Sequence, residues 1–575
     1  MEYLQNYDPL HHPVLSTGVA ALPVVTLLYL LALHPRRAGD GSVHLGIAAH
    51  RAAMIAVAVA VGVALVVFRM PVRTAGMSLV FGAMYGIFPI GWIVIGAMFL
   101  YTITLVSGLF DVLKDSVASL SADRRVQAIL IAFSFGAFVE GAAGFGTPVA
   151  ISGAILVGLG FAPLEAAVLC LIANTAPVAF GALGTPITAL SGVTDISPML
   201  ISRMAARQLP FFSMIVPVWM VAVQVRMEGR GWRDVAGVWP ALVVSGGTFA
   251  GTQFLVGNYW NHLLVDILGG VVSMGAVAVL CRFWQPSDRK DVLTEMSTPV
   301  DGGVRVGTLD DQSPHKRSRV VMAWVPWALL TIAVFAWGIP GVKKALDGVP
   351  GAKVDWGVPA VNGVVYRTPP VVTAKAIDKA IYSINWLSAP GTGIVIAAII
   401  SGVVLGLSPG QWGVATVRTA ARLRLPLLTI CLILSMGFIT KYSGMDAVLG
   451  LAFTRTGRLY PFFAAMLGWL GVALTGSDTS SNVMFGSMQK ITAQQAGLNS
   501  ILIVTANSTG GVMGKMIDAQ SIVVATAACY EDQREGKLAV GPIFRAVLPH
   551  SVALAVLMGI LVMLQAYVFK GMIPK

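Results

Sequence analysis

Two long apolar segments of this chain are interrupted near their middle by glycines, hydroxyl residues and a carboxylate. They span residues 127–160 and 460–493, and Thr147 and Ser480 occupy matching places in them, 333 positions apart. As straight helices at 1.5 Å per residue they would be about 50 Å long, which exceeds the roughly 30 Å hydrocarbon core of a membrane. Each interruption therefore predicts a re-entrant hairpin, which enters the membrane and returns to the same side.

The composition excludes an ordinary soluble protein. Of the 575 residues, 56% are hydrophobic and only 11% are charged, whereas soluble domains carry about 25% charged residues. Repeated apolar runs of about 20 residues indicate an all-α polytopic membrane protein and not a barrel, whose strands would alternate. The net charge of +12 comes largely from short basic loops such as 36–37 and 418–424. This is the positive-inside pattern of membrane proteins, so we expect no nucleic-acid partner.

The hydropathy pattern predicts about 12 transmembrane helices besides the two hairpins. The crossings are predicted at 14–34, 45–68, 86–110, 164–190, 208–226, 238–257, 262–283, 320–339, 383–407, 425–443, 497–530 and 546–569. Residues 1–13 contain no Lys or Arg, while Arg36 and Arg37 follow the first crossing. The even number of crossings then places both the N-terminus and the C-terminus outside.

A shift of 333 positions relates the two halves of the chain and predicts four regions. These are an N-terminal span over 1–44, repeat 1 over 45–226 with hairpin 127–160 and broken helix 164–190, connecting spans and extramembrane loops over 227–377, and repeat 2 over 378–575 with hairpin 460–493 and broken helix 497–530. Six predicted crossings separate the two broken helices, so the repeats are inverted, an arrangement typical of secondary transporters. We expect segments 284–319 and 340–382 to be loops without chemistry.

Broken helices leave free backbone N–H groups and carbonyls that can bind a carboxylate and a cation. We predict that glycines at the interruptions allow close approach and that short polar side chains supply hydrogen bonds. The predicted substrate-binding residues are Gly144, Gly146, Thr147, Asn174, Thr175, Thr479, Ser480, Ser481, Asn482, Asn507, Ser508 and Lys515. Lys515 would neutralise a substrate carboxylate, or else pair permanently with Asp518 or Asp478. A packing role for the small residues is the structural alternative.

Ionisable groups inside a bilayer cost about 2.5 to 3.5 kcal/mol, so each needs a partner or a function. Asp478, or failing that Glu140, is predicted to carry a coupling proton, and Na⁺ is the alternative coupling ion. Glu165, His262 and Asp266 lie near predicted span ends and are interpreted as interfacial residues. We expect no catalytic residue, no metal site and no cofactor. An intramembrane enzyme is a remote alternative, because Asp478 lacks a suitable partner Asp or His base.

Several long motifs closely resemble the bacterial L-lactate permease family, which includes glycolate permeases. They are Gln5 to Pro9, Phe135 to Pro148, Asn174 to Ala182, Gly468 to Asn482, Ala506 to Met516, and Gln520-Ser521. The resemblance implies proton-coupled import of small 2-hydroxymonocarboxylates (L-lactate, glycolate and D-lactate) across the bacterial inner membrane. Monomer and homodimer both remain open.

The family is also distantly similar to the ion-transporter superfamily, which implies an elevator mechanism by fold-level analogy. One departure from the family pattern is Lys441, where a neutral Asn is expected before Tyr-Ser-Gly. We expect the Lys441 side chain to extend to the membrane interface.

Overall fold

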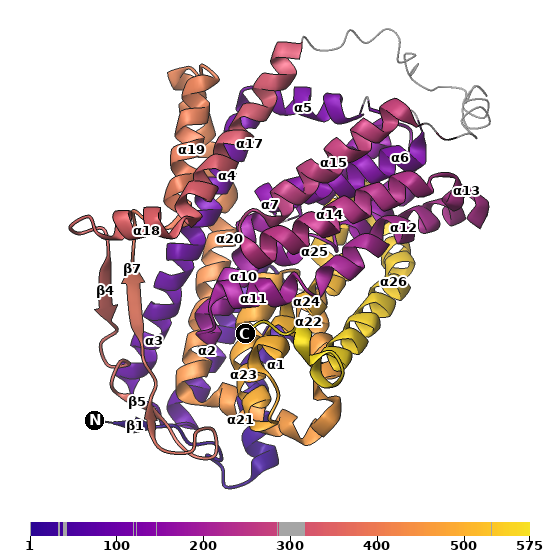
Figure 1. The fold of residues 1–575 in the computed structure, drawn as a ribbon. Coiled ribbons are helices and arrows are strands. Elements are labelled where there is room, and N and C mark those ends of the chain that lie inside the picture. Colours follow the sequence, from indigo (N-terminus) through magenta and orange to yellow (C-terminus); the bar gives the residue numbers. More distant parts are fainter. Residues whose placement is uncertain are drawn as a thin grey trace.

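The computed structural model describes residues 2–32, 35–37, 43–45, 47–118, 120–121, 123–144, 146–284, 286, 317–530 and 532–575, which form mainly helices (Figure 1). Within these ranges, 10 helices are long and apolar enough to cross a membrane, or up to 12 if each of two bent helix pairs is counted as one span. The predicted class, an all-α polytopic membrane protein, is therefore confirmed. The set of spans differs from the predicted crossings, because it includes Arg124–Ala142 and Met445–Thr475, which overlap the predicted hairpins, and lacks the crossings predicted at 238–257 and 383–407.

The first crossings differ from prediction in one place. The helices are α1 (Pro13–Ala32), α2 (Ala49–Val66), α3 (Val72–Tyr85), the π-helical segment η1 (Gly86–Gly91), α4 (Trp92–Val106) and α5 (Leu109–Ala118). α3 and α4 are joined through η1, which is kinked at Phe88, into one apolar segment over Val72–Val106, so the crossing predicted at 86–110 begins too late. Arg73 and several glycines lower the hydropathy of α3, but Gly82 lets it pack directly on a distant helix. A methyl group at Gly82 would lie 2.5 Å from the Leu434 carbonyl oxygen.

The first interrupted segment forms a helical hairpin. One arm consists of α6 (Arg124–Ala128), η2 (Ile129–Phe135) and α7 (Gly136–Ala142), and the other arm is α8 (Thr147–Gly158). The arms pack against each other and are joined by a short turn, in which Gly144 and Gly146 have positive φ angles of 56° and 78°. A helix bent by 64° follows, made of α9 (Pro163–Ala173), η3 (Val178–Phe180) and α10 (Gly181–Thr194).

The second interrupted segment has the same form. The arms α22 (Tyr460–Thr475) and α23 (Asp478–Gln495) pack together and are separated by only Gly476 and Ser477. The Ser477 side chain caps α23 by accepting a hydrogen bond from the Ser480 N–H, a common way to begin a helix. The bent helix that follows consists of α24 (Ser500–Gly514), η5 (Lys515–Ile517) and α25 (Ala519–Cys529), with a bend of 42°.

Other helices recur in the same order in both halves of the chain. In the first half α2, α3–α4, α5 and α12 (Leu209–Met227) accompany the hairpin. In the second half α19 (Pro390–Val404), α20 (Pro409–Ser443), α21 (Met445–Phe453) and α26 (Gln533–Tyr567) do so in the same sequence positions. α20 begins well before the crossing predicted at 425–443, because Ser408 and Gln411 form a capping box at its start.

The remaining helices of the described ranges are α11 (Pro198–Ala205), α13 (Trp232–Gly237), α14 (Trp239–Tyr259), α15 (Val265–Phe283), α17 (Arg317–Gly338) and α18 (Pro340–Asp347), with short turns η4 (Thr454–Leu459) and η6 (Lys570–Met572). α15 packs on α7 and α14, while α17 packs on α19. Of the predicted loop 284–319, residues 287–316 lie outside the described residues.

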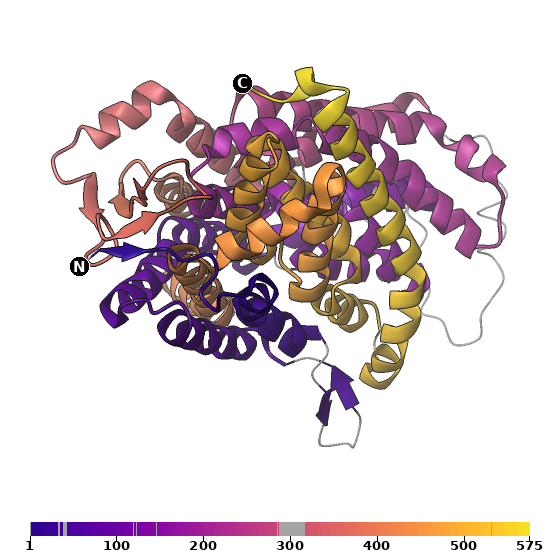
Figure 2. The same ribbon diagram turned by 90° about the horizontal axis from the view of Figure 1, so that it is seen from below.

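The sequence predicts a loop over 340–382, but this segment contains regular structure. Besides α18, it contains β4 (Val354–Gly357), β5 (Val365–Arg367) and β6 (Ala376–Ile377), and β7 (Ile381–Ile384) follows closely. β4 pairs antiparallel with β7, while β5 pairs with β6 and with the N-terminal strand β1 (Tyr3–Leu4). A further hairpin joins β2 (Pro35–Arg37) and β3 (Val43–Leu45). Figure 2 shows β1 beside the strands of this segment at one edge of the molecule.

Each hairpin packs on the broken helix of the other half of the chain. α10, from the first half, packs on α23, the arm of the second hairpin. Reciprocally α25, from the second half, packs on α8, the arm of the first hairpin. α20 lies against α2 and α3 on one side and against α23 on the other. These contacts bring both hairpin tips to one side of α20.

Candidate functional site

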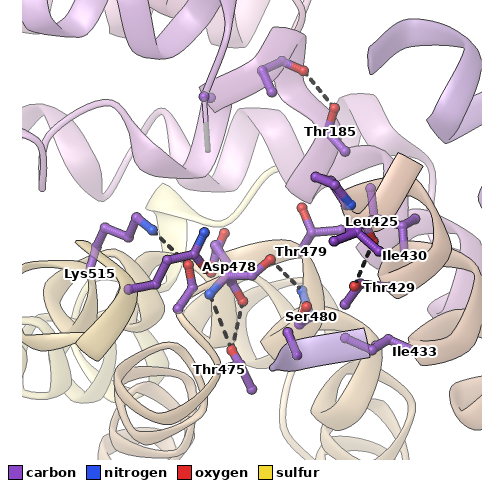
Figure 3. Close-up of a pocket in the computed structure, with 18 of the residues that line it drawn as sticks. Thr185, Leu425, Thr429, Ile430, Ile433, Thr475, Asp478, Thr479, Ser480 and Lys515 are labelled. Carbon is purple, nitrogen blue, oxygen red and sulfur yellow. Dashed lines mark hydrogen bonds between the residues drawn. The ribbon is translucent and has the colours of Figure 1, made fainter. Parts of the chain in front are cut away.

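A cavity of about 780 Å³ lies where the two hairpin tips approach α20. Gly144 and Thr147 line it from the first hairpin, and residues 474–480 line it from the second. Figure 3 shows Thr475, Asp478, Thr479 and Ser480 at the second tip, with Thr185 opposite them and α20 side chains such as Thr429 alongside. The interruptions of both apolar segments therefore face one common space.

The predicted site residues divide into two groups. Those that line the cavity are Glu140, Gly144, Thr147, Asp478, Thr479, Ser480 and Lys515. Those that lie outside its lining are Gly146, Asn174, Thr175, Ser481, Asn482, Asn507 and Ser508. Except for Gly146, which caps α8, the second group is buried beneath the tips. The structure thus brings the hydroxyl residues of both tips together and places most of the predicted amide side chains behind them.

The start of α23 faces the cavity. Asp478 is its first residue and Thr479 follows, so the N–H groups at the start of the helix lie at the cavity wall, while the Ser480 N–H is bonded to Ser477. The partial positive charge at a helix N-terminus favours an anion. Gly476 permits the sharp turn before α23, with a φ of 71°, which an L side chain rarely adopts.

Asp478 is held by hydrogen bonds from behind the tip. Its Oδ2 accepts a 2.5 Å bond from Ser508 Oγ and a 3.2 Å bond from Asn482 Nδ2. Its Oδ1 lies against Gly511, where a methyl group would be only 2.4 Å away. Asn507 extends this network by donating to Asn482 Oδ1 at 2.9 Å. The network joins the second hairpin to α24.

Lys515 joins the second tip to the bend of the broken helix. Its Nζ donates a 2.6 Å hydrogen bond to the Gly476 carbonyl and lies 3.3 Å from Asp518 Oδ2. Asp518 also caps α25 by accepting a 2.7 Å bond from the Ser521 N–H. Of the two roles considered for Lys515, the structure shows the pairing with Asp518. Its ammonium charge is therefore already balanced, although the side chain lines the cavity.

Arg422 is a cavity residue that the sequence analysis missed. It lies on α20, and its Nη2 donates a 3.4 Å hydrogen bond to Thr147 Oγ1 at the first tip. Its guanidinium carbon is 5.7 Å from the centre of the Tyr101 ring. In the part of the chain that the structure describes, no acidic side chain forms an ion pair with Arg422. The missed signal was the capping box at Ser408, which places Arg422 inside a helix and not in a basic loop.

Glu140 has different surroundings from Asp478. It is 4% exposed, and its Oε1 faces Gly181, where a methyl group would be 2.6 Å away. Among the described residues its Oε2 has no hydrogen-bond partner. The same holds for both amide atoms of Asn174, which is 3% exposed. The second hairpin has a connected network around Asp478 and Asn507, although Asp478 Oδ1 and Gln489 Oε1 also lack partners among the described residues.

The residues predicted to be interfacial, Glu165, His262 and Asp266, lie at or just before the first turns of α9 and α15. Glu165 and Asp266 are 5% and 1% exposed, so both are buried inside the protein. Glu165 Oε2 accepts a 3.2 Å hydrogen bond from Arg124. His262 is half-buried, with its Nε2 3.1 Å from Thr188 Oγ1. The Lys441 side chain is enclosed by the protein, and its Nζ pairs at 2.8 Å with Oδ2 of Asp195, whose side chain is 59% exposed.

Comparisons with known proteins give consistent matches. The family model described as L-lactate permease matches residues 16–569. The chain is 42% identical to the L-lactate permease of Bacillus subtilis (strain 168) over 587 residues, which covers 100% of both chains. It is also 42% identical to the glycolate permease GlcA and to the L-lactate permease of Escherichia coli (strain K12), with 99% of each chain covered in both cases.

Among solved structures, the Alcanivorax borkumensis YdaH transporter gives a TM-score of 0.42 at 15% identity, covering 96% of this chain and 98% of that one. Neisseria gonorrhoeae MtrF gives a TM-score of 0.43 at 13% identity, covering 97% and 95%.

Proposed function

Because the chain belongs to the L-lactate permease family, we propose that it is a secondary active transporter that imports L-lactate, glycolate and D-lactate by proton symport. The family is one of permeases and not of enzymes, so the intramembrane-enzyme alternative is excluded. The many apolar helices agree with a multi-pass membrane protein. We place it in the bacterial inner membrane with both termini outside.

The observation that carries this proposal is the cavity shared by the two hairpin tips and α20. A small hydroxycarboxylate needs a positive group for its carboxylate and hydrogen-bonding groups for its hydroxyl. The start of α23 and the Arg422 guanidinium both line the cavity and supply positive potential. Thr147, Thr479 and Ser480 supply short polar side chains beside them. We propose that the substrate carboxylate lies between Arg422 and the start of α23.

Lys515 then has a supporting role in our proposal. Its pairing with Asp518 and Gly476 holds the second tip in place. A cation without an acidic partner binds an added carboxylate better than one already paired, because no existing ion pair must be broken. This favours Arg422 over Lys515 as the main partner of the substrate.

We propose that the site is exposed alternately to the two sides by movement of the hairpins and broken helices relative to α20 and its neighbours. The reciprocal packing of α10 on α23 and of α25 on α8 supports a pair of inverted repeats. Both tips lie against α20, so a shift of that contact would open and close the cavity. Such rigid movement of one repeat-derived unit is common in transporters with inverted repeats.

For the coupling proton, Glu140 is better placed than Asp478. Asp478 Oδ2 accepts two hydrogen bonds, whereas its Oδ1, like Glu140 Oε2, has no partner among the described residues. Within the described ranges Glu140 Oε2 has no donor, and an unpaired buried charge is strongly unfavourable. A proton on Glu140 removes that charge. We therefore propose Glu140 as the proton carrier and Asp478 as the residue that joins the second hairpin to α24.

Counterflow in proteoliposomes tests the substrate class. Vesicles loaded with unlabelled L-lactate should take up labelled L-lactate, and external glycolate and D-lactate should compete with it. Succinate should not compete, because the cavity offers one cation without an acidic partner among the described residues. Strong inhibition by succinate would contradict the monocarboxylate proposal. Uptake driven by a sodium gradient with no proton gradient would favour the sodium-coupled alternative.

A further inference from the structure

Asp266 is a buried carboxylate that the proposed transport mechanism does not yet use. It lies in the first turn of α15, outside both predicted repeats, and is 1% exposed. In the part of the chain that the structure describes, neither of its carboxylate oxygens has a hydrogen-bond partner, and no ion pair reaches it. A fully buried carboxylate in this state costs several kcal/mol unless a proton or another cation neutralises it.

The first turn of α15 packs directly on the first hairpin beside Glu140. A methyl group at Gly141 would lie 2.8 Å from Asp266 Cβ and 2.9 Å from the Ile267 nitrogen. There is thus no room for a side chain at Gly141. Because glycine has none, α15 can pack directly against α7 next to Glu140. The two carboxyl groups are close enough for their charges to repel each other.

Asn174 adds a third polar group to this place. Its amide lies beside the Glu140 carboxyl without a hydrogen bond of good geometry. The corresponding residue of the second half, Asn507, has a saturated amide that donates to Ser481 and Asn482 and accepts from Gln489. Asn174 therefore corresponds to Asn507 along the chain, but its side-chain amide lacks such partners. Buried polar atoms are paired in most proteins, so a cluster of unpaired ones indicates a missing ligand.

We propose that Glu140, Asp266 and Asn174 form one binding site for the coupling cation, which reaches it through the substrate cavity that Glu140 lines. This rests on the proposed symport function and adds to it a second acidic residue. Two carboxylates and an amide oxygen are suitable ligands for a proton or for Na⁺. Without the cation the site contains two buried negative charges, which are unfavourable to move through the membrane. We therefore expect the transporter to change its orientation only after the cation has bound.

Few other charges act on this site. Lys515 and Asp518, which pair with each other, face Glu140 from the second half of the chain. Among the helices packed against α7 and α15, α4, α8, α10 and α14 contain no Asp, Glu, Lys, Arg or His. Glu165, at the start of α9, is paired with Arg124, and His262, one turn before Asp266, contacts Thr188. Thus no cation of the described chain is free to balance Asp266.

The test separates exchange from gradient-driven transport in the Asp266→Asn variant. In a 1:1 symporter, a gradient of one pH unit drives about tenfold accumulation of substrate. Asp266→Asn should abolish this accumulation and should reduce it by a larger factor than it reduces lactate counterflow, since exchange needs no net cation movement. The same pair of assays under a sodium gradient identifies the cation. Asp111→Asn is the control, because Asp111 also lies in the first turn of a helix, α5, but is exposed.

Two further measurements test the proposed site if Asp266→Asn transports poorly. An unpaired buried carboxylate destabilises the protein, so Asp266→Asn should not lower the thermal unfolding temperature of the purified protein. The double variant Glu140→Gln/Asp266→Asn should be no more defective in accumulation than either single variant, because the residues serve one site. Unchanged accumulation in Asp266→Asn, additive defects, or equal loss of counterflow and accumulation in a folded variant would each overturn the site. If the unchanged protein shows no lactate counterflow, it is the proposed function that fails.

Discussion

The Lys515 ammonium group donates a 2.6 Å hydrogen bond to the carbonyl oxygen of Gly476, at the tip of the second hairpin. The two residues are 39 positions apart in the sequence, so the bond joins the bend of the broken helix to the turn of the hairpin. Gly476 can accept it because its positive φ turns the chain sharply before α23. The second tip is therefore held by a side chain from another element and does not rely on its own turn alone.

Lys515→Met should weaken this junction. It removes the ion pair of Asp518, which is 1% exposed, and leaves that carboxylate buried without its cation. Removing one member of a buried pair costs about 3 to 5 kcal/mol. Thermal unfolding in detergent should show a large loss of stability, and Lys515→Met/Asp518→Asn should recover part of it. A Lys515→Met protein as stable as the unchanged one would contradict the pairing.

Arg422→Gln should reduce the preference for an anion. We expect the KM for L-lactate to rise at least about tenfold, the usual scale for losing a charge-assisted contact of 1.5 to 3 kcal/mol. The neutral analogue lactamide should lose much less. Arg418→Gln, one helical turn earlier on α20 and outside the cavity lining, is the matched control. An unchanged ratio of lactate to lactamide affinity in Arg422→Gln would exclude the guanidinium as the carboxylate partner.

Gly511→Ala should displace Asp478. The added methyl group would lie 2.4 Å from Asp478 Oδ1 and 2.8 Å from a methyl carbon of Val472. Overpacking of this kind costs about 1 to 3 kcal/mol, and the movement of Asp478 should impair transport. Gly251→Ala in α14 is the control, since open space surrounds that position, and alanine there should be neutral or slightly stabilising. Normal transport by Gly511→Ala would show that the position of Asp478 is not critical.

Ser508→Ala should weaken the hold on Asp478 without changing the lining of the cavity. The substitution removes the 2.5 Å hydrogen bond to Asp478 Oδ2, which is charge-assisted and worth about 1.5 to 3 kcal/mol. We expect a lower unfolding temperature and slower counterflow with little change in the preference for lactate over lactamide. A specific loss of that preference would instead place Ser508 in contact with the substrate.

The features predicted best from the sequence were those that follow from local chemistry. The clusters around Gly144 and Gly476 were visible because glycine and hydroxyl residues contrast with the apolar residues on both sides. The unpredicted features depend on contacts made only in the folded chain. α3 and the first half of α20 contain arginines that suggest loops, yet both belong to long helices, and Gly82 packs α3 on Leu434 and Ser435 in the second half of α20. Burial of Asp266 depends on Gly141, a residue 125 positions away that leaves space for α15.

The asymmetry between the two hairpins was also only partly predictable. The sequence shows that Asn174 and Asn507 correspond, and this suggested equal roles. In the folded chain the Asn507 side-chain amide is saturated by Gln489, Ser481 and Asn482, whereas neither side-chain amide atom of Asn174 has a hydrogen-bond partner within the described ranges. Correspondence along the chain fixes where a residue lies but not which partners the rest of the fold supplies.

Lactate accumulation driven by a proton gradient tests the central claim most directly. Purified protein in proteoliposomes, acidic outside and free of sodium, should concentrate labelled L-lactate above its external level, and collapse of the gradient with a protonophore should release it. Glu140→Gln should retain counterflow but lose accumulation, because the proton carrier we propose is neutral in that variant. Full accumulation by Glu140→Gln, or none by the unchanged protein, would contradict proton symport through this site.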